Sequence, residues 1–367
     1  MEIKKTALLI LEDNTVFRGI LFGAGVETSG EVVFNTGMTG YNETLTDPSY
    51  KGQIVTLTYP LIGNYGVPKL KVKNHLSNLF ESDKIHIQAL IVNNYSYDYS
   101  HWNADLTLDK WLKKEGIPAI TGIDTRMLTK KLREKGTMLG RIVIADNFTG
   151  SFNKSKCFNP DKQNVVDMVS VREPIKYSCG DKHAKDIVLI DCGVKHSIIR
   201  NLLKRGVNVI RVPWNYDFID KGIDFDGVLV SNGPGDPNNV KETIKIVKKV
   251  LKAGKPILGI CLGHQIMALA VGMKTFKLKY GHRAQNQPCL IKETESCIIT
   301  SQNHGFTVND KKLPEGWKIW FKNANDGTNE GLIHKTKPFF AVQFHPEASP
   351  GPEDAEFIFD KFLEGLK

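Results

Sequence analysis

The sequence predicts an α/β protein with two unlike parts. Residues 185–367 are expected to form a doubly wound parallel-type sheet with helices on both faces, because apolar runs alternate there with amphipathic helical segments. Residues 1–146 are expected to form a β-rich α+β domain, since short β-rich runs follow one another between turn residues. A chain of 367 residues is also long enough for about two domains.

The first part contains the runs GEVVFN, GQIVTLTY and HIQALIV, separated by Gly, Pro, Asn and Asp, and a helix is expected near residues 125–135. Residues 147–184 are polar and poorly periodic, which favours a linker with one short helix around residues 163–170. The chain has no repeat of fixed period.

The second part begins with the runs DIVLIDCG, VNVIRVP, FDGVLVSN and KPILGIC, which we interpret as strands. The segment VKETIKIVKKVLKAG, residues 240–254, has an apolar stripe at helical spacing with lysines opposite: Val240, Ile244, Val247 and Leu251. We interpret it as a helix packed on the sheet, with a solvated face that does not bind nucleic acid. In parallel sheets, sites form at the carboxyl ends of strands, and Cys261 follows one of them.

The composition excludes several classes of protein. A hydrophobic content of 41% and a charged content of 24% are typical of soluble globular proteins. The net charge of +9 is spread along the chain, so no nucleic-acid partner is expected. No apolar run approaches the roughly 18 residues of a membrane span, and the short apolar run near the N-terminus lacks a signal-peptide cleavage site. The six cysteines form no CxxC pair, and no metal site is expected, which fits a cytoplasmic location.

The stretch PILGICLGHQ, residues 256–265, places a cysteine between glycines where a strand should end. The pattern of glycine, any residue, nucleophile, any residue, glycine is typical of a nucleophile elbow, a sharp turn from a strand into a helix. A helix N-terminus and a nearby imidazolium can lower a thiol pKa from about 8.5 to roughly 3.5 to 7.5. A lone cysteine is often structural, but the flanking glycines favour Cys261 as a nucleophile.

The segment FFAVQFHPEASPGPED supplies the partners that a nucleophilic cysteine needs. Pro346 favours extended geometry at His345, so His345 and Glu347 are expected to project to the same side. His345 would then move the proton while Glu347 orients the imidazole and stabilises its cation.

Two further segments have glycines that allow a ligand to approach the backbone. SNGPGDP, residues 231–237, follows a strand and is either an oxyanion hole or a plain turn. NHGF, residues 303–306, includes His304. One base suffices for a cysteine nucleophile, so His304 and His264 are expected to be structural or to contact the ligand.

With these motifs in their order NGPGDP, GICLGHQ and HPE, the second part resembles the class I, triad-type glutamine amidotransferases. The first part looks like the N-terminal domain of the carbamoyl-phosphate synthase small chain family, through GEVVFNTGMTGYNETLTDPSYKGQIVTLTYPLIGNYG and ITGIDTRMLTKKLREKG. DCGVKHSIIRNLLKRG is similar to that family's hinge into the amidotransferase domain. The resemblance covers essentially the whole chain.

The resemblance implies a Cys261, His345 and Glu347 triad that hydrolyses L-glutamine. It implies an oxyanion hole formed by the N–H groups of Gly233 and Leu262, since Pro234 has none. The residues that it implies for glutamine binding come from both parts of the chain: Ser49, Gly233, Gly235, Leu262, Gln265, Asn303, Gly305 and Phe306. The chain departs from the family pattern at Ala284, Gln287 and Ser197, where glycine, histidine and asparagine are usual.

The resemblance also implies a partner, a large ATP-using subunit that makes carbamoyl phosphate from ammonia, bicarbonate and ATP for pyrimidines and arginine. This chain has no G-x-x-x-x-G-K-[ST] loop, so ATP and Mg²⁺ are expected only in that subunit, with no cofactor here. We expect a heterodimer that can assemble further. The alternatives are a stand-alone cysteine hydrolase of γ-glutamyl compounds and a silent binding subunit.

Overall fold

The computed structural model describes residues 5–145, 152–154, 157–294 and 296–366. The chain divides into two compact units, Met1–Lys162 and Gln163–Lys367. This division falls inside the expected linker, whose first boundary at residue 146 lies outside the described residues.

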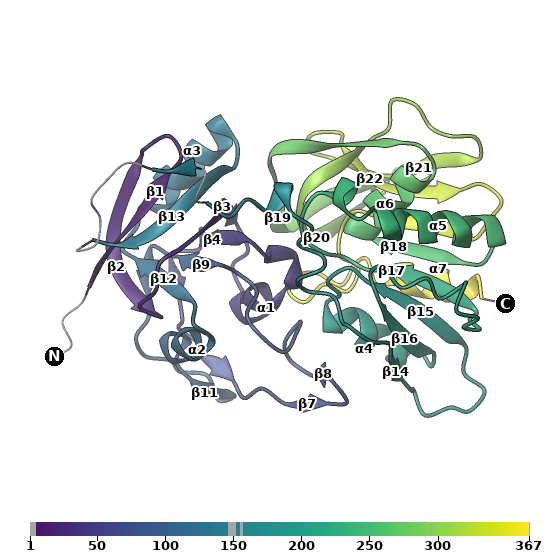
Figure 1. The fold of residues 1–367 in the computed structure, drawn as a ribbon, viewed down its shortest axis with the longest axis horizontal. Helices are drawn as coiled ribbons and strands as arrows, with labels where there is room; N and C mark the ends of the chain where they lie inside the picture. The colour runs from purple at the N-terminus through teal and green to yellow at the C-terminus, as the bar shows by residue number, and fades with distance from the viewer. Residues whose placement is uncertain (1–4, 146–151, 155–156, 295, 367) are drawn as a thin grey trace. The chain divides into compact units, whose positions relative to one another are not determined.

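The first unit is built on a closed seven-stranded barrel (Figure 1). The strands follow one another around the barrel in this order: β1 (Thr6–Leu11), β13 (Met138–Ile144), β3 (Thr28–Asn35), β4 (Gln53–Leu57), β9 (Ala89–Ile91), β12 (Pro118–Thr121) and β2 (Val16–Gly23). Alternate residues point to opposite faces of a strand. Val32 and Val33 are both fully buried, so both faces of β3 are covered. The mixed α/β class is confirmed, and the first unit is rich in strands as expected.

Helices and short strand pairs complete the first unit. The helices are α1 (Tyr41–Thr46), η1 (Pro48–Tyr50), α2 (Leu108–Glu115), α3 (Thr125–Lys135) and η4 (Pro160–Lys162). Three pairs of short strands lie outside the barrel: β5 (Leu61–Ile62) with β10 (Asn94–Tyr95), β6 (Val67–Pro68) with β11 (Ala104–Leu106), and β7 (Val72–Lys73) with β8 (Leu76–Ser77). Leu45 of α1 and Leu112 of α2 pack in one core cluster with Val33. The helix expected near residues 125–135 is confirmed by α3.

The second unit is built on one ten-stranded sheet. Its order is β14 (Ile175–Tyr177), β16 (Asn208–Pro213), β15 (Asp186–Asp191), β17 (Gly227–Val230), β18 (Ile257–Ile260), β23 (Phe339–Val342), β22 (Asn329–His334), β21 (Trp317–Asn323), β19 (Lys274–Ile291) and β20 (Cys297–Asn309). The five strands from β16 to β23 run parallel to one another. They form the parallel sheet that the sequence predicts.

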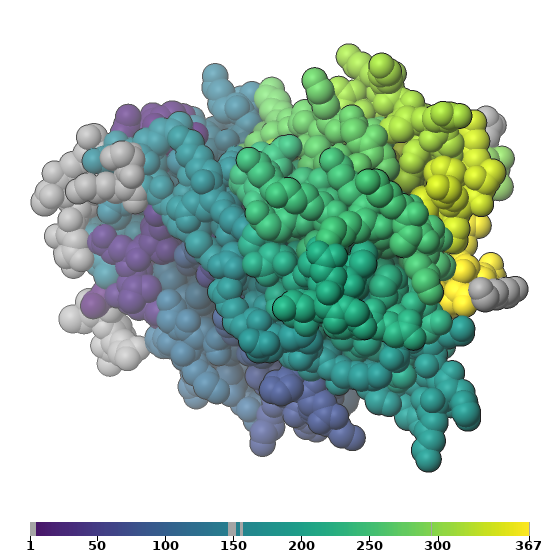
Figure 2. All heavy atoms as spheres, turned by 45° about the vertical axis from the view of Figure 1, so that its right-hand side comes forward, coloured from purple at the N-terminus to yellow at the C-terminus, as the bar shows by residue number. Residues whose placement is uncertain are grey.

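Helices cover both faces of the parallel strands, as expected. The chain passes from β15 to β16 through α4 (His196–Lys204) and, in the opposite direction along the sheet, from β17 to β18 through α5 (Lys241–Ala253). Because such crossovers are right-handed, α4 and α5 lie on opposite faces. α6 (Leu262–Ala270) packs beside α5 (Figure 1), and both helices contribute to the core cluster of the second unit. Figure 2 shows the atoms of the second unit, teal and green to yellow, closely packed at the surface. α7 (Phe357–Glu364) places Phe362 against Gly227 of β17.

The lysine-rich helix is confirmed as a helix that packs on the sheet, with its apolar stripe slightly rotated from the expected one. Val247 is fully buried, but Ile244 is only partly buried. Ile246 and Val250 lie deeper in the core than the expected stripe would place them. Among the described residues, no helix combines the length and the apolar character needed to cross a membrane.

Three sequence-based expectations differ from the structure. The other half of the sheet, β22, β21, β19 and β20, is antiparallel, because long hairpins extend the parallel strands. The expected helix around residues 163–170 is wrong, since this segment forms turns. Nor are residues 163–184 a plain linker. Val166 is buried in the core of the second unit, and β14 pairs with β16 at the edge of its sheet.

Candidate active site

Cys261 occupies the turn between β18 and α6. Its backbone has φ 53° and ψ −102°, a combination that only a residue held by its surroundings adopts. A Cβ on Gly263, two residues later, would lie 2.1 Å from the carbonyl oxygen of Val230, so the helix starts this close to the sheet only with glycine there. The structure therefore has the geometry of a nucleophile elbow, with Cys261 2% exposed.

His345 and Glu347 follow the neighbouring strand. β18 and β23 are parallel with Ile260 opposite Val342, so the segments after both strands emerge at the same edge of the sheet. His345 Nδ1 donates to Glu347 Oε1 at 2.6 Å, and both side chains are almost fully buried. The other ring nitrogen, Nε2, is also buried and has no hydrogen-bond partner among the described residues. Nε2 is thus the nitrogen available to exchange a proton with Cys261.

Charge stabilises the protonated imidazole. Burial alone would lower the pKa of His345, but the Glu347 carboxylate and the nearby Cys261 sulfur outweigh it and raise this pKa to about 10. Burial alone would raise the pKa of Glu347, but the charges of Lys195 and His345 lower it to about 2. At neutral pH the arrangement is therefore an imidazolium held beside an ionised carboxylate.

Lys195 is a functional candidate that the sequence reasoning missed. Its Nζ lies 3.0 Å from Glu347 Oε1, and its side chain is only 4% exposed. The same Nζ donates to the carbonyl oxygen of Ala348 at 2.6 Å. Lysine is almost never fully buried without a partner, and here the partner is the carboxylate that also holds His345. The only sequence signal is the position of Lys195 just after β15, at the same edge of the sheet as Cys261.

Gly233 and Leu262 lie side by side at this edge. A Cβ on Gly233 would fall 2.0 Å from the carbonyl oxygen of Cys192 and 2.9 Å from a Leu262 methyl group, which excludes any larger residue. Leu262 is the first residue of α6, so its N–H has no partner within the helix. Gly235 has φ +85°, which turns the loop after Pro234. The structure thus brings together the two residues expected to form an oxyanion hole.

The NHGF segment lies on β20, next to the cysteine. The Cys261 thiol donates a weak hydrogen bond to the carbonyl oxygen of Asn303 at 3.7 Å. Gln265 Nε2 donates to the carbonyl oxygen of Phe306 at 2.8 Å, with Gly305 just before it on the strand. Of the glutamine-binding candidates in the second unit, Asn303 contacts Cys261, Gln265 contacts Phe306, and Gly233 lies against Leu262.

The two other histidines of these motifs are held by neutral contacts. His264 Nδ1 lies 3.2 Å from Gln343 Oε1, and burial lowers the pKa of His264 to about 4. His304 Nδ1 donates to the carbonyl oxygen of Phe306 at 2.8 Å, and burial holds the pKa of His304 well below its usual range. Neither imidazole makes a hydrogen bond to a carboxylate as His345 does to Glu347, although Glu330 Oε1 lies 3.9 Å from His304 Nε2.

Ser49 belongs to the first unit, in η1, where its N–H donates to Asp47 Oδ1. Its part in a glutamine site stays a prediction. Two of the family departures lie on β19 of the second unit, where Ala284 is buried and the Gln287 amide oxygen accepts from Asn325 at 3.2 Å. The third, Ser197, is buried in α4. None of the three belongs to the cluster of Cys261, His345 and Glu347.

The fold of the second unit and its cysteine elbow define a class of protein. Residues 188–364 match the model of glutamine amidotransferase class-I. Residues 9–142 match the model of the carbamoyl-phosphate synthase small chain, CPSase domain. The chain belongs to the carbamoyl-phosphate synthase small chain family.

Three relatives illustrate this membership. The chain is 47% identical to the carbamoyl phosphate synthase arginine-specific small chain of Neurospora crassa, covering 98% of this chain and 80% of that protein. It is 52% identical to multifunctional protein CAD of Squalus acanthias, covering 98% of this chain and 16% of that protein. It is 47% identical to the mitochondrial carbamoyl-phosphate synthase [ammonia] of Rattus norvegicus, covering 99% of this chain and 24% of that protein. The chain thus spans about a sixth of the length of the Squalus relative.

Proposed function

We propose that this chain hydrolyses L-glutamine and delivers the ammonia to an ATP-using partner that makes carbamoyl phosphate. The observation that carries the proposal is the buried cluster of Cys261, His345 and Glu347 at a nucleophile elbow. Family membership alone does not select this reaction, because the name of the Rattus relative specifies ammonia. The complete set of thiol, imidazole and carboxylate in this chain favours glutamine.

In the first half-reaction, the Cys261 thiolate attacks the side-chain amide carbon of glutamine. The carbonyl oxygen becomes an oxyanion, and the N–H groups of Gly233 and Leu262 stabilise it. When the carbon–nitrogen bond breaks, protonated His345 gives its proton to the leaving nitrogen, and ammonia departs. A γ-glutamyl thioester on Cys261 and a neutral imidazole remain.

In the second half-reaction, water attacks the thioester while His345 Nε2 takes the proton of the water. The thioester bond breaks, glutamate leaves, and the thiolate and imidazolium are restored. Throughout, Glu347 holds Nδ1 and the positive charge of the ring. Lys195 keeps the Glu347 carboxylate ionised, since it lowers the pKa of that group.

Ammonia in water is mostly ammonium, which has no lone pair for attack on an activated bicarbonate. We therefore propose that ammonia leaves through an enclosed path into a large ATP-using subunit, docked largely on the β-rich first unit. Ser49 of the first unit would contribute to glutamine binding. ATP and Mg²⁺ belong to the partner, and this chain needs no cofactor for hydrolysis. We propose the cytoplasm as the location, where the six free cysteines of the chain stay reduced.

The test is glutamine hydrolysis by the purified chain, alone and with the large subunit, ATP and bicarbonate. We expect slow hydrolysis alone and a marked rise in the active complex, because closure at one site can assemble the other. Full turnover without the partner would indicate a stand-alone γ-glutamyl hydrolase. No hydrolysis under either condition would indicate a silent binding subunit.

Channelling is tested separately, with unlabelled glutamine and an excess of isotopically labelled ammonium. Carbamoyl phosphate from the complex should carry little label if the ammonia stays enclosed. Label equal to that of the bulk ammonium pool would contradict the enclosed path while leaving glutamine hydrolysis intact.

A further inference from the structure

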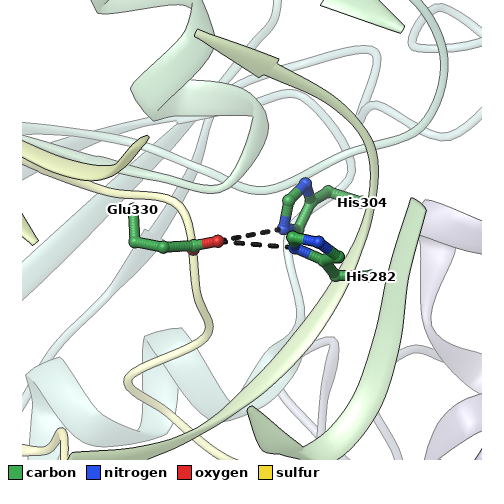
Figure 3. Close-up of side chains that lie close together, drawn as sticks. All are labelled: His282, His304 and Glu330. Atoms are coloured by element: carbon green, nitrogen blue, oxygen red, sulfur yellow. Dashed lines mark ion pairs between the residues drawn. The ribbon is translucent and has the colours of Figure 1, made fainter. Parts of the chain in front are cut away.

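A second cluster of ionisable side chains lies in the antiparallel half of the second unit's sheet. It consists of His282 on β19, His304 on β20 and Glu330 on β22. His282 and His304 are directly opposite each other in the strand register. Figure 3 shows the Glu330 carboxylate facing both imidazole rings. No step of the proposed glutamine reaction uses His282 or Glu330.

The distances in this cluster fit a metal ion. Glu330 Oε1 lies 3.4 Å from His282 Nδ1 and 3.9 Å from His304 Nε2. One ligand atom from each of the three residues lies within 4.8 Å of the other two. A tetrahedral ion with bonds of about 2.0–2.1 Å separates neighbouring ligand atoms by roughly 3.3 Å. The distances from Glu330 Oε1 to the two ring nitrogens, 3.4 and 3.9 Å, are close to this spacing.

The outer hydrogen bonds direct the correct ring nitrogens inward. His282 Nε2 donates to Asp326 Oδ2 at 2.9 Å, which leaves the Nδ1 lone pair toward Glu330. His304 Nδ1 donates to the carbonyl oxygen of Phe306, which leaves Nε2 toward the Gln302 amide oxygen at 3.1 Å and Glu330 Oε1 at 3.9 Å. Histidines that bind metals almost always make such a second hydrogen bond to a carboxylate or a backbone carbonyl.

The buried Glu330 carboxylate has few hydrogen-bond partners. Glu330 is fully buried, its Oε2 has no hydrogen-bond partner among the described residues, and His282 Nδ1 is only 3.4 Å from its Oε1. Glu330 Oε1 accepts only long hydrogen bonds, from Asn323 at 3.3 Å and Thr328 at 3.5 Å. A buried carboxylate with so few hydrogen bonds is unfavourable unless a cation compensates it. The His282 side chain is 10% exposed, which gives an ion access from solvent.

We propose that His282, His304 and Glu330 bind one divalent transition-metal ion of the Zn²⁺ class. Two imidazole nitrogens and one carboxylate oxygen are a ligand set that suits zinc. The fourth ligand is water or the amide oxygen of Gln302, which lies 3.1 Å from His304 Nε2. The proposal replaces the expectation of no metal in this chain. That expectation came from local spacing, which does not detect ligands on three separate strands.

A positive side chain and a proton both oppose metal binding at this cluster. The Arg283 guanidinium acts on His304 and opposes a cation, whereas the Glu330 and Asp326 carboxylates favour one. Without a metal, burial opposes protonation of His282, but the two carboxylates outweigh it and raise the pKa of His282 to about 9. A proton on His282 is therefore the alternative occupant that the experiment has to distinguish.

The experiment uses the full chain without a polyhistidine tag, treated with a chelator and then equilibrated with Zn²⁺ in dialysis. We expect one bound zinc per chain and at least a tenfold loss of affinity in His282→Asn and Glu330→Gln. His334→Asn is the matched control, because His334 lies on the same strand as Glu330 but outside the cluster. Unchanged binding in both cluster variants, or no zinc binding by the wild-type chain, overturns the proposal.

Two further measurements distinguish loss of the metal site from misfolding, and binding at this cluster from metal binding elsewhere on the chain. Asp326→Asn changes a half-exposed residue whose Oδ2 orients His282 and whose Oδ1 accepts from Thr328. The asparagine amide oxygen can still accept from Thr328, so the chain should stay folded while zinc binding weakens by about 10- to 100-fold. Co²⁺ in place of Zn²⁺ should give a tetrahedral spectrum without a thiolate charge-transfer band. A thiolate band that disappears in Cys297→Ser would assign the metal to that exposed cysteine and contradict the proposal.

Discussion

The parallel and antiparallel halves of the second unit's sheet contribute to the candidate active site in different ways. The parallel half places Cys261 and His345 just after the ends of adjacent strands, where a turn fixes each side chain. The antiparallel half presents Asn303 from within a long strand, where only the register decides what it faces. In the proposed reaction, strand ends therefore supply the reacting groups, and strand faces supply the surroundings. Substitutions in the two halves should separate chemistry from binding.

The largest effect is expected from Cys261→Ser. Glutamine hydrolysis should fall to background, because a hydroxyl is a far weaker nucleophile than a thiolate, while fold and partner binding persist. Synthesis of carbamoyl phosphate from added ammonia by the complex should survive and serves as the control. Hydrolysis near the wild-type rate would show that the elbow does not supply the nucleophile.

His345→Asn should be nearly as damaging. Removal of a general acid and base typically costs on the order of 10² to 10⁴ in rate, and the loss should appear in kcat. Steady-state glutamine hydrolysis measures it, with His264→Asn as a comparison at a second buried histidine. A negligible effect of His345→Asn would move the base elsewhere, with His304 the next candidate.

Glu347→Gln should be milder, with a loss of about 10-fold at neutral pH, because the imidazole itself remains. The carboxylate stabilises the imidazolium, so its removal lowers the pKa of His345 from about 10 toward the ordinary value. Activity that needs protonated His345 is lost as pH rises through this pKa. The alkaline limb of kcat/KM against pH should therefore move to lower pH in the variant. An unmoved limb would mean that Glu347 does not set this pKa.

The smallest effect is expected where the two halves of the sheet meet. Gln265→Ala removes the hydrogen bond to the carbonyl oxygen of Phe306, a loss of about 1 to 1.5 kcal/mol or roughly tenfold. We expect this loss in KM for glutamine with little change in kcat. Ile299→Ala, at an exposed position on the same strand as Phe306, should leave both constants unchanged. A fall in kcat as large as that of His345→Asn would erase the distinction between the two halves.

The parallel half could be predicted from sequence because its signals are local. The glycines around Cys261, the proline after His345 and the apolar runs before both are contained in a few adjacent residues. Strand order then follows from the right-handed crossover rule. The cluster of Cys261, His345 and Glu347 could therefore be predicted, although their roles stay a proposal.

The remaining features depend on contacts between distant segments. Lys195 reaches Glu347 only because β15 and β23 end at the same edge of the sheet, and nothing near Lys195 in the sequence indicates a carboxylate partner. The antiparallel half was missed because β19 and β20 are long strands whose pairing is decided by register. The polar segment that resembled a linker is held by one edge strand and by buried Val166, a signal too short for periodicity to detect.

The backbone angle at Cys261 has an evolutionary consequence. A positive φ costs a non-glycine residue of order 1–3 kcal/mol, and glycine adopts it readily. For folding alone, glycine would be the better residue at this turn, so the thiol is kept at the expense of stability. In a lineage that had lost the proposed glutamine reaction, protein stability would not favour a cysteine at this position. The residue that a relative carries at this position should therefore report whether selection for glutamine use continues.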